Sequence, residues 1–347
     1  MNKLLEIEDL SVSFFTGNGE VKAVRGVSFG LSEGEILGIV GESGSGKSVT
    51  SLSILRLLAD SAKVKQGKIL FDSQDISSVS SSSIRQLRGG SISMIFQDPM
   101  SSLNPLIPAG KQIAEMLEIH KRELSARERK AETVRLMEMV RIPEAEKRFD
   151  SYPHEFSGGM RQRIMIAMAL ACKPKLLIAD EPTTALDVTI QNQILKLLQS
   201  LQRDMSMSII FITHDLGVVA EICHRVIVMY GGMIMEEGSV DEIFDFPMHP
   251  YTIGLMKSIP SIEQDKDEIL IPIPGSPPDM LNPPSGCPFA PRCAYVRNLC
   301  IDKSPPYRRV SEGHRSMCWL LDPKAPADED NPFADYLLHC QKGGVLR

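Results

Sequence analysis

A glycine-rich run of eight residues, Gly41 to Ser48, constrains this chain more than any other feature of its sequence. It reads GESGSGKS and fits the pattern G-x-x-x-x-G-K-[ST] at every fixed position. A short apolar run over residues 35–40 precedes it, and apolar residues at helical spacing follow from Val49 to Leu58. The sequence therefore predicts a buried strand, a glycine loop and a helix in direct succession.

This succession is suited to binding phosphate. Glycines let the backbone fold into a concave loop whose N–H groups point at phosphate oxygens, and the helix adds the positive end of its dipole. Lys47 is expected to reach the β- and γ-phosphates of a nucleotide, and Ser48 to bind Mg²⁺. The expected nucleotide-binding residues here are Gly41, Glu42, Ser43, Gly44, Ser45, Gly46, Lys47, Ser48 and Val49.

Strand and helix signals alternate through the following residues. Leu176–Ala179 and Ile209–Ile212 are short apolar runs typical of buried strands, and residues 186–201 repeat apolar side chains at helical spacing. Residues 98–153 are helical in composition and highly charged, as expected for a solvated helical region. The alternation predicts an α/β fold with a largely parallel sheet covered on both faces.

Two further motifs carry chemistry. Asp180 and Glu181 end an apolar strand, where Asp180 suits a Mg²⁺ role and Glu181 suits polarising an attacking water. Without the glycine loop, such a carboxylate pair is more simply a solvated turn. Ser157, Gly158 and Gly159 combine a helix-capping serine with two glycines that expose backbone N–H groups. This is a second anion site, and one nucleotide rarely needs two such sites from one chain.

The ordered set of motifs makes residues 4–250 resemble the nucleotide-binding subunits of ABC transporters. The resemblance implies a P-loop ATPase core, with a mostly parallel sheet, an N-terminal antiparallel β part and a helical subdomain at about residues 98–165. It also implies roles outside the glycine loop: Phe14 stacks on adenine, with Phe15 a weaker candidate, Gln97 is the Q-loop glutamine, Asp187 belongs to the D-loop and His214 is the switch histidine.

The same resemblance implies a head-to-tail dimer of two identical or homologous ATPase subunits. The signature residues Ser157, Gly158, Gly159 and Met160 of one subunit close over ATP held by the glycine loop of the other. The commonest family signature is Leu-Ser-Gly-Gly-Gln, and Phe156 and Met160 replace its two ends here. The Ser-Gly-Gly centre is intact, so the hydrolytic competence of the site is expected to persist.

For the chemistry, the resemblance implies ATP hydrolysis with Mg²⁺. Glu181 acts as the base toward water, His214 holds the γ-phosphate and Lys47 neutralises charge. The implied Mg²⁺ ligands are Ser48, Gln97 and Asp180.

The composition changes near residue 260, where prolines and cysteines become frequent. Cys287, Cys293, Cys300 and Cys318 fall within 32 residues, at spacings C-x5-C, C-x6-C and C-x17-C. Structural zinc sites usually pair cysteines across two to four residues, and the common ferredoxin runs differ as well. On spacing alone, the four thiols could hold a metal centre, bind zinc or remain free.

Three segments resemble ATPase subunits of dipeptide and oligopeptide importers. They are Met100 to Pro105, Phe246 to Thr252 and the cysteine-containing stretch from Cys287 to Cys293. The resemblance implies a cassette over residues 1–245, a small irregular extension over residues 246–347, and a [4Fe–4S] cluster on the four cysteines. It further implies two membrane-spanning permease subunits and an extracytoplasmic substrate-binding protein as partners. Importers of nickel and other small solutes share this tail, so the solute stays open between them.

Composition limits the competing functions. The longest apolar run, Ile164 to Cys172, has nine residues, well short of the roughly 20 needed to span a bilayer. No secretory signal is visible at the start, so a cytoplasmic setting is the default. The resemblance to importer subunits implies a peripheral protein at the cytoplasmic face of the membrane. A net charge of −6 gives no global basic field for nucleic acid. A single cassette without sustained heptads disfavours a soluble ABC-type ATPase acting on nucleic acid or ribosomes. Few aromatic residues among the tail arginines and the absence of zinc spacing disfavour a nucleic-acid-binding zinc ribbon.

Overall fold

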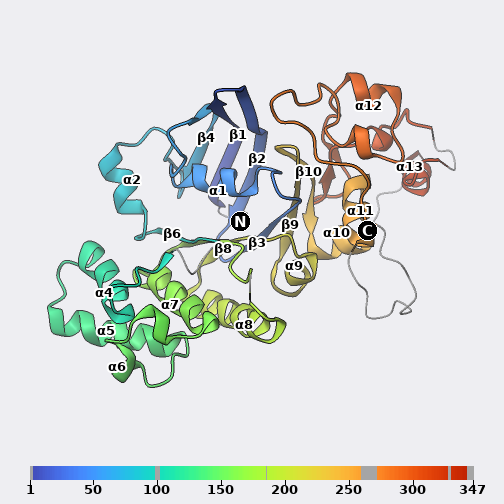
Figure 1. Ribbon diagram of the computed structural model, residues 1–347. Coiled ribbons are helices and arrows are strands. Elements are labelled where there is room, and N and C mark those ends of the chain that lie inside the picture. The colour runs from blue at the N-terminus through green and yellow to red at the C-terminus, as the bar shows by residue number, and fades with distance from the viewer. Residues whose placement is uncertain (1–2, 98–101, 185, 259–271, 327–329, 342–347) are drawn as a thin grey trace.

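The computed structural model describes residues 3–97, 102–184, 186–258, 272–326 and 330–341. Its central layer is an eight-stranded sheet in the order β11-β12-β10-β9-β3-β8-β7-β6 (Figure 1). The strands that pair in parallel are β3 (Ile36–Val40), β7 (Leu176–Asp180), β8 (Ser208–Ile212), β9 (Arg225–Tyr230) and the edge strand β6 (Ile92–Ile95). Every residue of β3, β7 and β8 is buried, as in sheets covered on both faces. The predicted α/β fold is confirmed.

A second, antiparallel sheet packs on one face of the central sheet, in the order β2-β1-β4-β5. Its strands are β1 (Lys3–Thr16), β2 (Gly19–Ser32), β4 (Ala62–Phe71) and β5 (Gln74–Asp75). Leu5, Leu10 and Val27 from this sheet share one apolar core with Leu37 and Ile39 of β3. The N-terminal antiparallel part expected from the resemblance is therefore confirmed.

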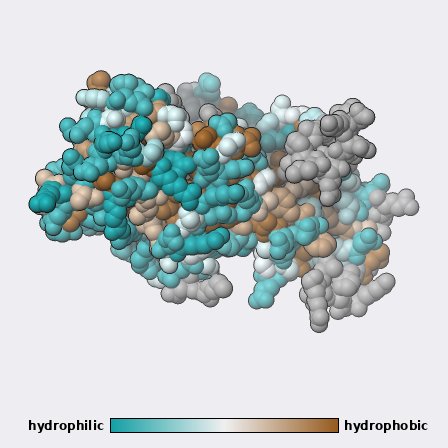
Figure 2. Space-filling view, turned by 90° about the horizontal axis from the view of Figure 1, so that it is seen from below, coloured by the Kyte–Doolittle hydropathy of each residue, from teal (hydrophilic) through white to brown (hydrophobic). Residues whose placement is uncertain are grey.

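Helices gather at the opposite side of the central sheet, lower left in Figure 1. They are α4 (Ala109–His120), α5 (Ala126–Met139), α6 (Ala145–Arg148) and α7 (Gly158–Leu170), and α2 (Ser81–Leu87) lies apart from them. Ser125 begins α5 with a capping box, in which its hydroxyl accepts the Glu128 N–H. Figure 2 shows mainly hydrophilic side chains over this helical region, which fits its high charge. The division of the chain at residues 98–165 and 245 stays a prediction.

The remaining helices connect or flank the inner strands: α1 (Lys47–Ile54), α8 (Val188–Met205), α9 (Leu216–Ile222), α10 (Val240–Asp245) and α11 (Pro250–Lys257). Within the described ranges, no helix is both long enough and apolar enough to cross a membrane.

Residues 246–347, the C-terminal extension, contribute strands to the central sheet. The extension contains α12 (Asn298–Asp302), α13 (Ala334–Gln341), β11 (Arg308–Arg309), β12 (Arg315–Ser316) and short 3₁₀ turns at Ala290–Arg292 and Trp319–Leu321. Strand β12 pairs antiparallel with β10 (Met233–Ser239), and β11 pairs with β12. The sheet therefore continues from the cassette into the extension.

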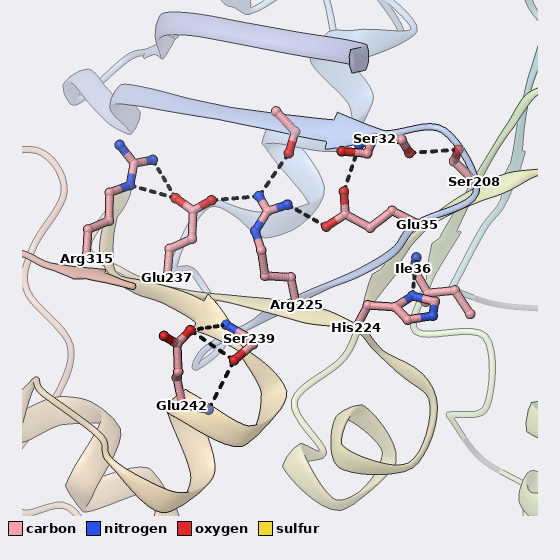
Figure 3. A network of polar contacts seen from close by, with 11 residues as sticks. Ser32, Glu35, Ile36, Ser208, His224, Arg225, Glu237, Ser239, Glu242 and Arg315 are labelled. Atoms are coloured by element: carbon pink, nitrogen blue, oxygen red, sulfur yellow. Dashed lines mark hydrogen bonds and ion pairs between the residues drawn. The ribbon is translucent and has the colours of Figure 1, made fainter. Parts of the chain in front are cut away.

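Ion pairs and hydrogen bonds between charged side chains connect the cassette strands to the extension at this junction (Figure 3). Arg225 of β9 binds Glu35 just before β3 and, at 2.7 Å, Glu237 of β10. Arg315 of β12 donates to the second oxygen of Glu237 at 2.7 Å. Deeper in the junction, His314 Nε2 lies 2.7 Å from Glu236 Oε1, with both side chains almost fully buried. One carboxylate on each face of β10 thus bonds to the extension.

Candidate nucleotide-binding site

The glycine loop follows β3 and leads into α1, as predicted. Gly41 and Gly46 both have positive φ, and a Cβ on either would approach a backbone oxygen too closely, at 2.1 Å from Met229 and 2.7 Å from Ala23. Gly46 begins α1 and supplies no side-chain cap. The first N–H groups of the helix are therefore left for an anion.

Lys47 lies across this loop. Its Nζ donates to the carbonyl oxygens of Gly41 at 2.7 Å and Glu42 at 3.0 Å. Burial lowers the pKa of Lys47, while the charges of Glu181, Asp180 and Glu42 act in the opposite direction. The loop thus holds a buried cation beside its own concave backbone, as a phosphate site requires.

Ser48 and Asp180 meet at the carboxyl end of the sheet although 132 residues separate them. The Ser48 hydroxyl donates to Asp180 Oδ1 at 3.1 Å. Burial raises the pKa of Asp180, and neighbouring Glu181 raises it further, while Ser48 and Lys47 lower it. A hydroxyl next to a carboxylate is an oxygen donor set that Mg²⁺ accepts.

Glu181 is the meeting point of the remaining polar side chains. Its Oε2 accepts hydrogen bonds from Gln97 Nε2 at 3.0 Å and Thr184 Oγ1 at 2.9 Å, and its Oε1 lies 3.5 Å from His214 Nδ1. The Glu181 backbone has a φ of 47°, a left-handed conformation that non-glycine residues adopt at a cost. The structure therefore brings together three of the residues singled out by sequence, Gln97, Glu181 and His214.

The signature residues lie at the start of α7. Ser157 caps the helix by accepting the Met160 N–H at 3.4 Å, and Ser157 and Gly158 are exposed. A Cβ on Gly159 would lie 2.6 Å from Ile190 Cγ2, so only glycine lets α7 approach α8 this closely. Phe156 is buried in the helical core, which explains why an apolar residue starts the motif. Among the described residues, 157–160 form no hydrogen bond or ion pair with 41–48.

Three further residues singled out from the sequence are Asp187, Phe14 and Phe15. Asp187 caps α8 through the Ile190 N–H at 3.0 Å. Phe14 is partly buried in β1, while Phe15 is exposed with the Lys63 and Lys65 ammonium groups 5.5 and 5.3 Å from its ring centroid. The two lysines already use the Phe15 face. Residues 98–101, which follow Gln97, and residue 185 lie outside the described residues. The structure therefore describes only residues 102–105 of the Met100–Pro105 run.

The four clustered cysteines line one small cavity with His249, Phe289 and Trp319. The cavity is about 10 Å³, room for one water, so a larger metal centre fits there only if the lining side chains move apart. Among the described residues, no group of three or more histidine, cysteine, aspartate or glutamate side chains is arranged to hold a metal ion. Burial raises the pKa of Cys287 to about 12 and of Cys293 to about 11, with added repulsion from Cys300.

Sequence reasoning missed three residues that contact the site. Thr184 donates to Glu181, Tyr251 accepts the backbone N–H of Glu42 at 2.9 Å, and Arg292 binds the Glu42 side chain. Thr184 follows the carboxylate pair by three residues, a spacing that could have suggested the contact. Tyr251 and Arg292 are 209 and 250 residues away from Glu42, and no local pattern indicates them.

Two families match the chain. Residues 24–184 match the family described as ABC transporter, and residues 235–300 match the oligopeptide/dipeptide transporter C-terminal region. In solved structures, the chain resembles the ATP-binding cassette MJ0796 in a post-hydrolysis dimer bound to ADP and Pi. That match has a TM-score of 0.62 and 27% identity, over 68% of this chain and 98% of the cassette. Fold and site together define an ABC-type ATPase.

The relatives of this chain define its class within the ABC-type ATPases more narrowly. The oligopeptide transport ATP-binding protein OppD of Bacillus subtilis is 54% identical over 95% of this chain and 92% of its own length. The dipeptide transport ATP-binding protein DppD of Lactococcus lactis is 51% identical over 93% of each chain. The chain belongs to the family of oligopeptide and dipeptide transport ATP-binding proteins of ABC transporters.

Proposed function

We propose that this chain hydrolyses ATP to drive the import of dipeptides or oligopeptides through separate permease subunits. The observation that carries the ATPase site is the convergence of Gln97, Thr184 and His214 on Glu181, beside the Ser48–Asp180 pair. The transport class is supported by the match over residues 235–300 and by the relatives, whose names specify oligopeptide and dipeptide transport.

The chemistry follows from the positions of these side chains. Ser48, Asp180 and Gln97 would hold Mg²⁺, which would supply positive charge to neutralise the β- and γ-phosphates. Lys47 leaves the Gly41 and Glu42 carbonyls to contact the same phosphates. Glu181, oriented by Thr184, accepts a proton from the attacking water, and His214 donates a hydrogen bond to the γ-phosphate.

A second ATPase subunit completes each site. The exposed Ser157 and Gly158 at the N-terminus of α7 are free to meet a γ-phosphate held by another subunit, as an anion is stabilised at a helix N-terminus. Gly159 and Met160 continue this contact, and Asp187 at the adjacent start of α8 lies at the same interface. The partner is a second copy or a homologous chain.

Permease binding is assigned to an apolar cavity of about 240 Å³ at the boundary of the helical region. Its lining includes Met94, Phe96, Met116, Met165 and Met168. Flexible methionine side chains can mould to a helix that docks there. Phe96 is next to Gln97, so movement of the docked helix reaches Glu181 directly. The chain then lies at the cytoplasmic face of the membrane and meets two permeases, with an extracytoplasmic binding protein on the other side.

Transport is tested in proteoliposomes that contain this chain, its permeases and any sister ATPase encoded nearby. With the binding protein present, ATP hydrolysis should rise several-fold on adding a dipeptide or a short peptide, and labelled peptide should accumulate across the membrane. A stimulation by nickel but by no peptide would assign the chain to metal import and contradict the peptide proposal.

We also propose that Cys287, Cys293, Cys300 and Cys318 hold a [4Fe–4S] cluster in a structural role. Support comes from the single cavity that all four thiols line. A cluster would supply a rigid four-point link between these segments.

The cluster is tested by anaerobic purification of the full chain. The protein should be brown, with about four iron and four sulfide per chain. Colourless protein with stoichiometric zinc, or with four reactive thiols and no metal, would contradict the assignment.

A further inference from the structure

Glu42, the second residue of the glycine loop, turns its side chain away from the concave face and toward the C-terminal extension. Its carboxylate accepts two hydrogen bonds from Arg292, from Nη1 at 2.7 Å and Nη2 at 3.1 Å. Its backbone N–H donates to the Tyr251 hydroxyl at 2.9 Å. Two separate segments of the extension therefore hold both the side chain and the backbone of this residue.

The Arg292 guanidinium is built for this contact. Its side chain is only 5% exposed. Besides Glu42, it donates to the Tyr230 hydroxyl at 3.1 Å and to the carbonyl oxygens of Ile273 at 3.1 Å and Pro274 at 2.8 Å. These five bonds account for all five N–H groups of the guanidinium. A bidentate arginine–carboxylate pair fixes orientation as well as distance, and here its arginine is buried while the Glu42 side chain is partly exposed.

The contact leads from Glu42 to the phosphate-binding groups. The Glu42 carbonyl oxygen accepts from Lys47 Nζ at 3.0 Å and from the Ser45 N–H at 3.2 Å. Contacts that hold Glu42 in place therefore also hold the curvature of the loop and the position of the Lys47 side chain in the absence of nucleotide. A second contact supports the same loop: the Gly232 N–H donates to the Ser45 carbonyl at 3.1 Å, and a Cβ on neighbouring Gly231 would lie 2.9 Å from Pro288.

The extension presents Arg292 from the segment that carries two of the clustered cysteines. Arg292 ends the 3₁₀ turn Ala290–Arg292, and Cys293 follows it directly. The Cys287 N–H donates to the Cys300 carbonyl at 2.8 Å, which ties this segment to α12. The position of Arg292 is thereby set by the packing of the extension and not by the cassette alone.

We propose that Arg292 is a positioning residue for ATP binding, which acts through Glu42 to hold the phosphate-binding loop in its binding-competent shape. The proposal rests on the nucleotide site of the proposed function and extends it to a residue that contacts no nucleotide. A loop shaped in advance binds ATP without paying for ordering, so the contact acts on affinity. Because Arg292 does not touch the reacting atoms, its loss should raise KM for ATP more than it lowers kcat.

The test compares ATP hydrolysis by the purified full-length chain and its Arg292→Ala and Arg292→Lys variants. We expect KM to rise about tenfold in Arg292→Ala, with kcat changed less than about twofold, and we expect a smaller rise in Arg292→Lys, which cannot form the bidentate pair. Glu42→Gln should raise KM as well, and adding Arg292→Ala to Glu42→Gln should cost little more. Direct titration with a fluorescent ATP analogue should follow the KM values.

Two controls separate the possible failures. Arg309→Ala removes an exposed arginine of the same extension whose side chain, within the part of the chain that the structure describes, donates to the nearby Ser311 and Glu312 carbonyls, and it should leave KM unchanged. Lys47→Ala should abolish ATP binding if the proposed site is correct. An unchanged KM in Arg292→Lys and Glu42→Gln, with binding lost in Lys47→Ala, contradicts the Arg292 proposal alone. Normal binding in Lys47→Ala contradicts the proposed function itself. Equal losses in Arg309→Ala and Arg292→Ala show general weakening of the extension and also contradict the proposal.

Discussion

The two glycine-containing loops of this chain, at residues 41–48 and 157–160, differ in how completely the chain itself surrounds them. The first is enclosed: Lys47 is buried, Ser48 bonds Asp180, and the extension holds Glu42. The second is exposed at Ser157 and Gly158, with a single long capping bond. An enclosed loop can bind a nucleotide within one chain, whereas an exposed one needs a second chain to complete a site.

The largest effect is expected where both loops share one nucleotide. Glu181→Gln keeps the size of the side chain and the hydrogen bond from Thr184 but removes the base, so turnover should fall about a thousandfold while ATP binding persists. The variant should accumulate as an ATP-bound dimer in size-exclusion chromatography with light scattering. Unchanged phosphate release would refute Glu181 as the base, and a purely monomeric ATP complex would argue against sharing between the loops.

A matched pair of capping serines isolates the second loop. Ser157 caps α7 and Ser125 caps α5, each by accepting an N–H three residues on. Replacing either by alanine should lower the free energy of unfolding by about 1 kcal/mol. Only Ser157→Ala should also reduce turnover, by about tenfold or more, because it alone removes a donor to phosphate. Equal turnover in the two variants would mean that the 157–160 loop serves only the helix.

Acidification tests the proposed Mg²⁺ ligand Asp180, which bonds Ser48 of the first loop. Burial raises the pKa of Asp180, so its carboxyl group gains a proton at a higher pH than an ordinary aspartate does. Since only the ionised form binds a cation well, the Mg²⁺ concentration for half-maximal hydrolysis should increase on acidification, and it should do so at a higher pH than an ordinary aspartate would give. Measurement of this concentration across pH checks the sign. A Mg²⁺ requirement that falls on acidification would contradict the role of Asp180.

The smallest effect concerns the base of the nucleotide. If Phe14 stacks on adenine, Phe14→Ala should raise KM for ATP about fivefold, consistent with the energy of one stacked ring. Phe15→Ala should leave KM unchanged, since Lys63 and Lys65 already cover the Phe15 ring. The reverse outcome would assign the stacking position to Phe15.

More of the structure around the first loop than of the extension could be predicted from the sequence, and the reason is physical. The glycine pattern and the apolar runs 35–40 and 176–179 are local signals. They predicted the strand–loop–helix unit and the carboxylates at the end of the second strand, which the structure shows as strands over 36–40 and 176–180. The bonds from Gln97 and His214 to Glu181 depend on how distant segments pack, so family resemblance and not periodicity suggested those residues. Strands β11 and β12 have two residues each, too short for any alternation to show.

The bonds across the junction between cassette and extension restrict how such chains can be recombined. An extension taken from a relative must supply a cation opposite Glu237, a partner for buried Glu236 and a hydroxyl at the position of Tyr251. A graft without these groups leaves Glu237 with Arg225 as its cation, but it removes the His314 contact of buried Glu236 and the acceptor of the Glu42 N–H. Removing the partner of a buried charge costs several kcal/mol. We therefore expect exchange of whole chains to keep these junction contacts, and exchange of the extension alone to break them.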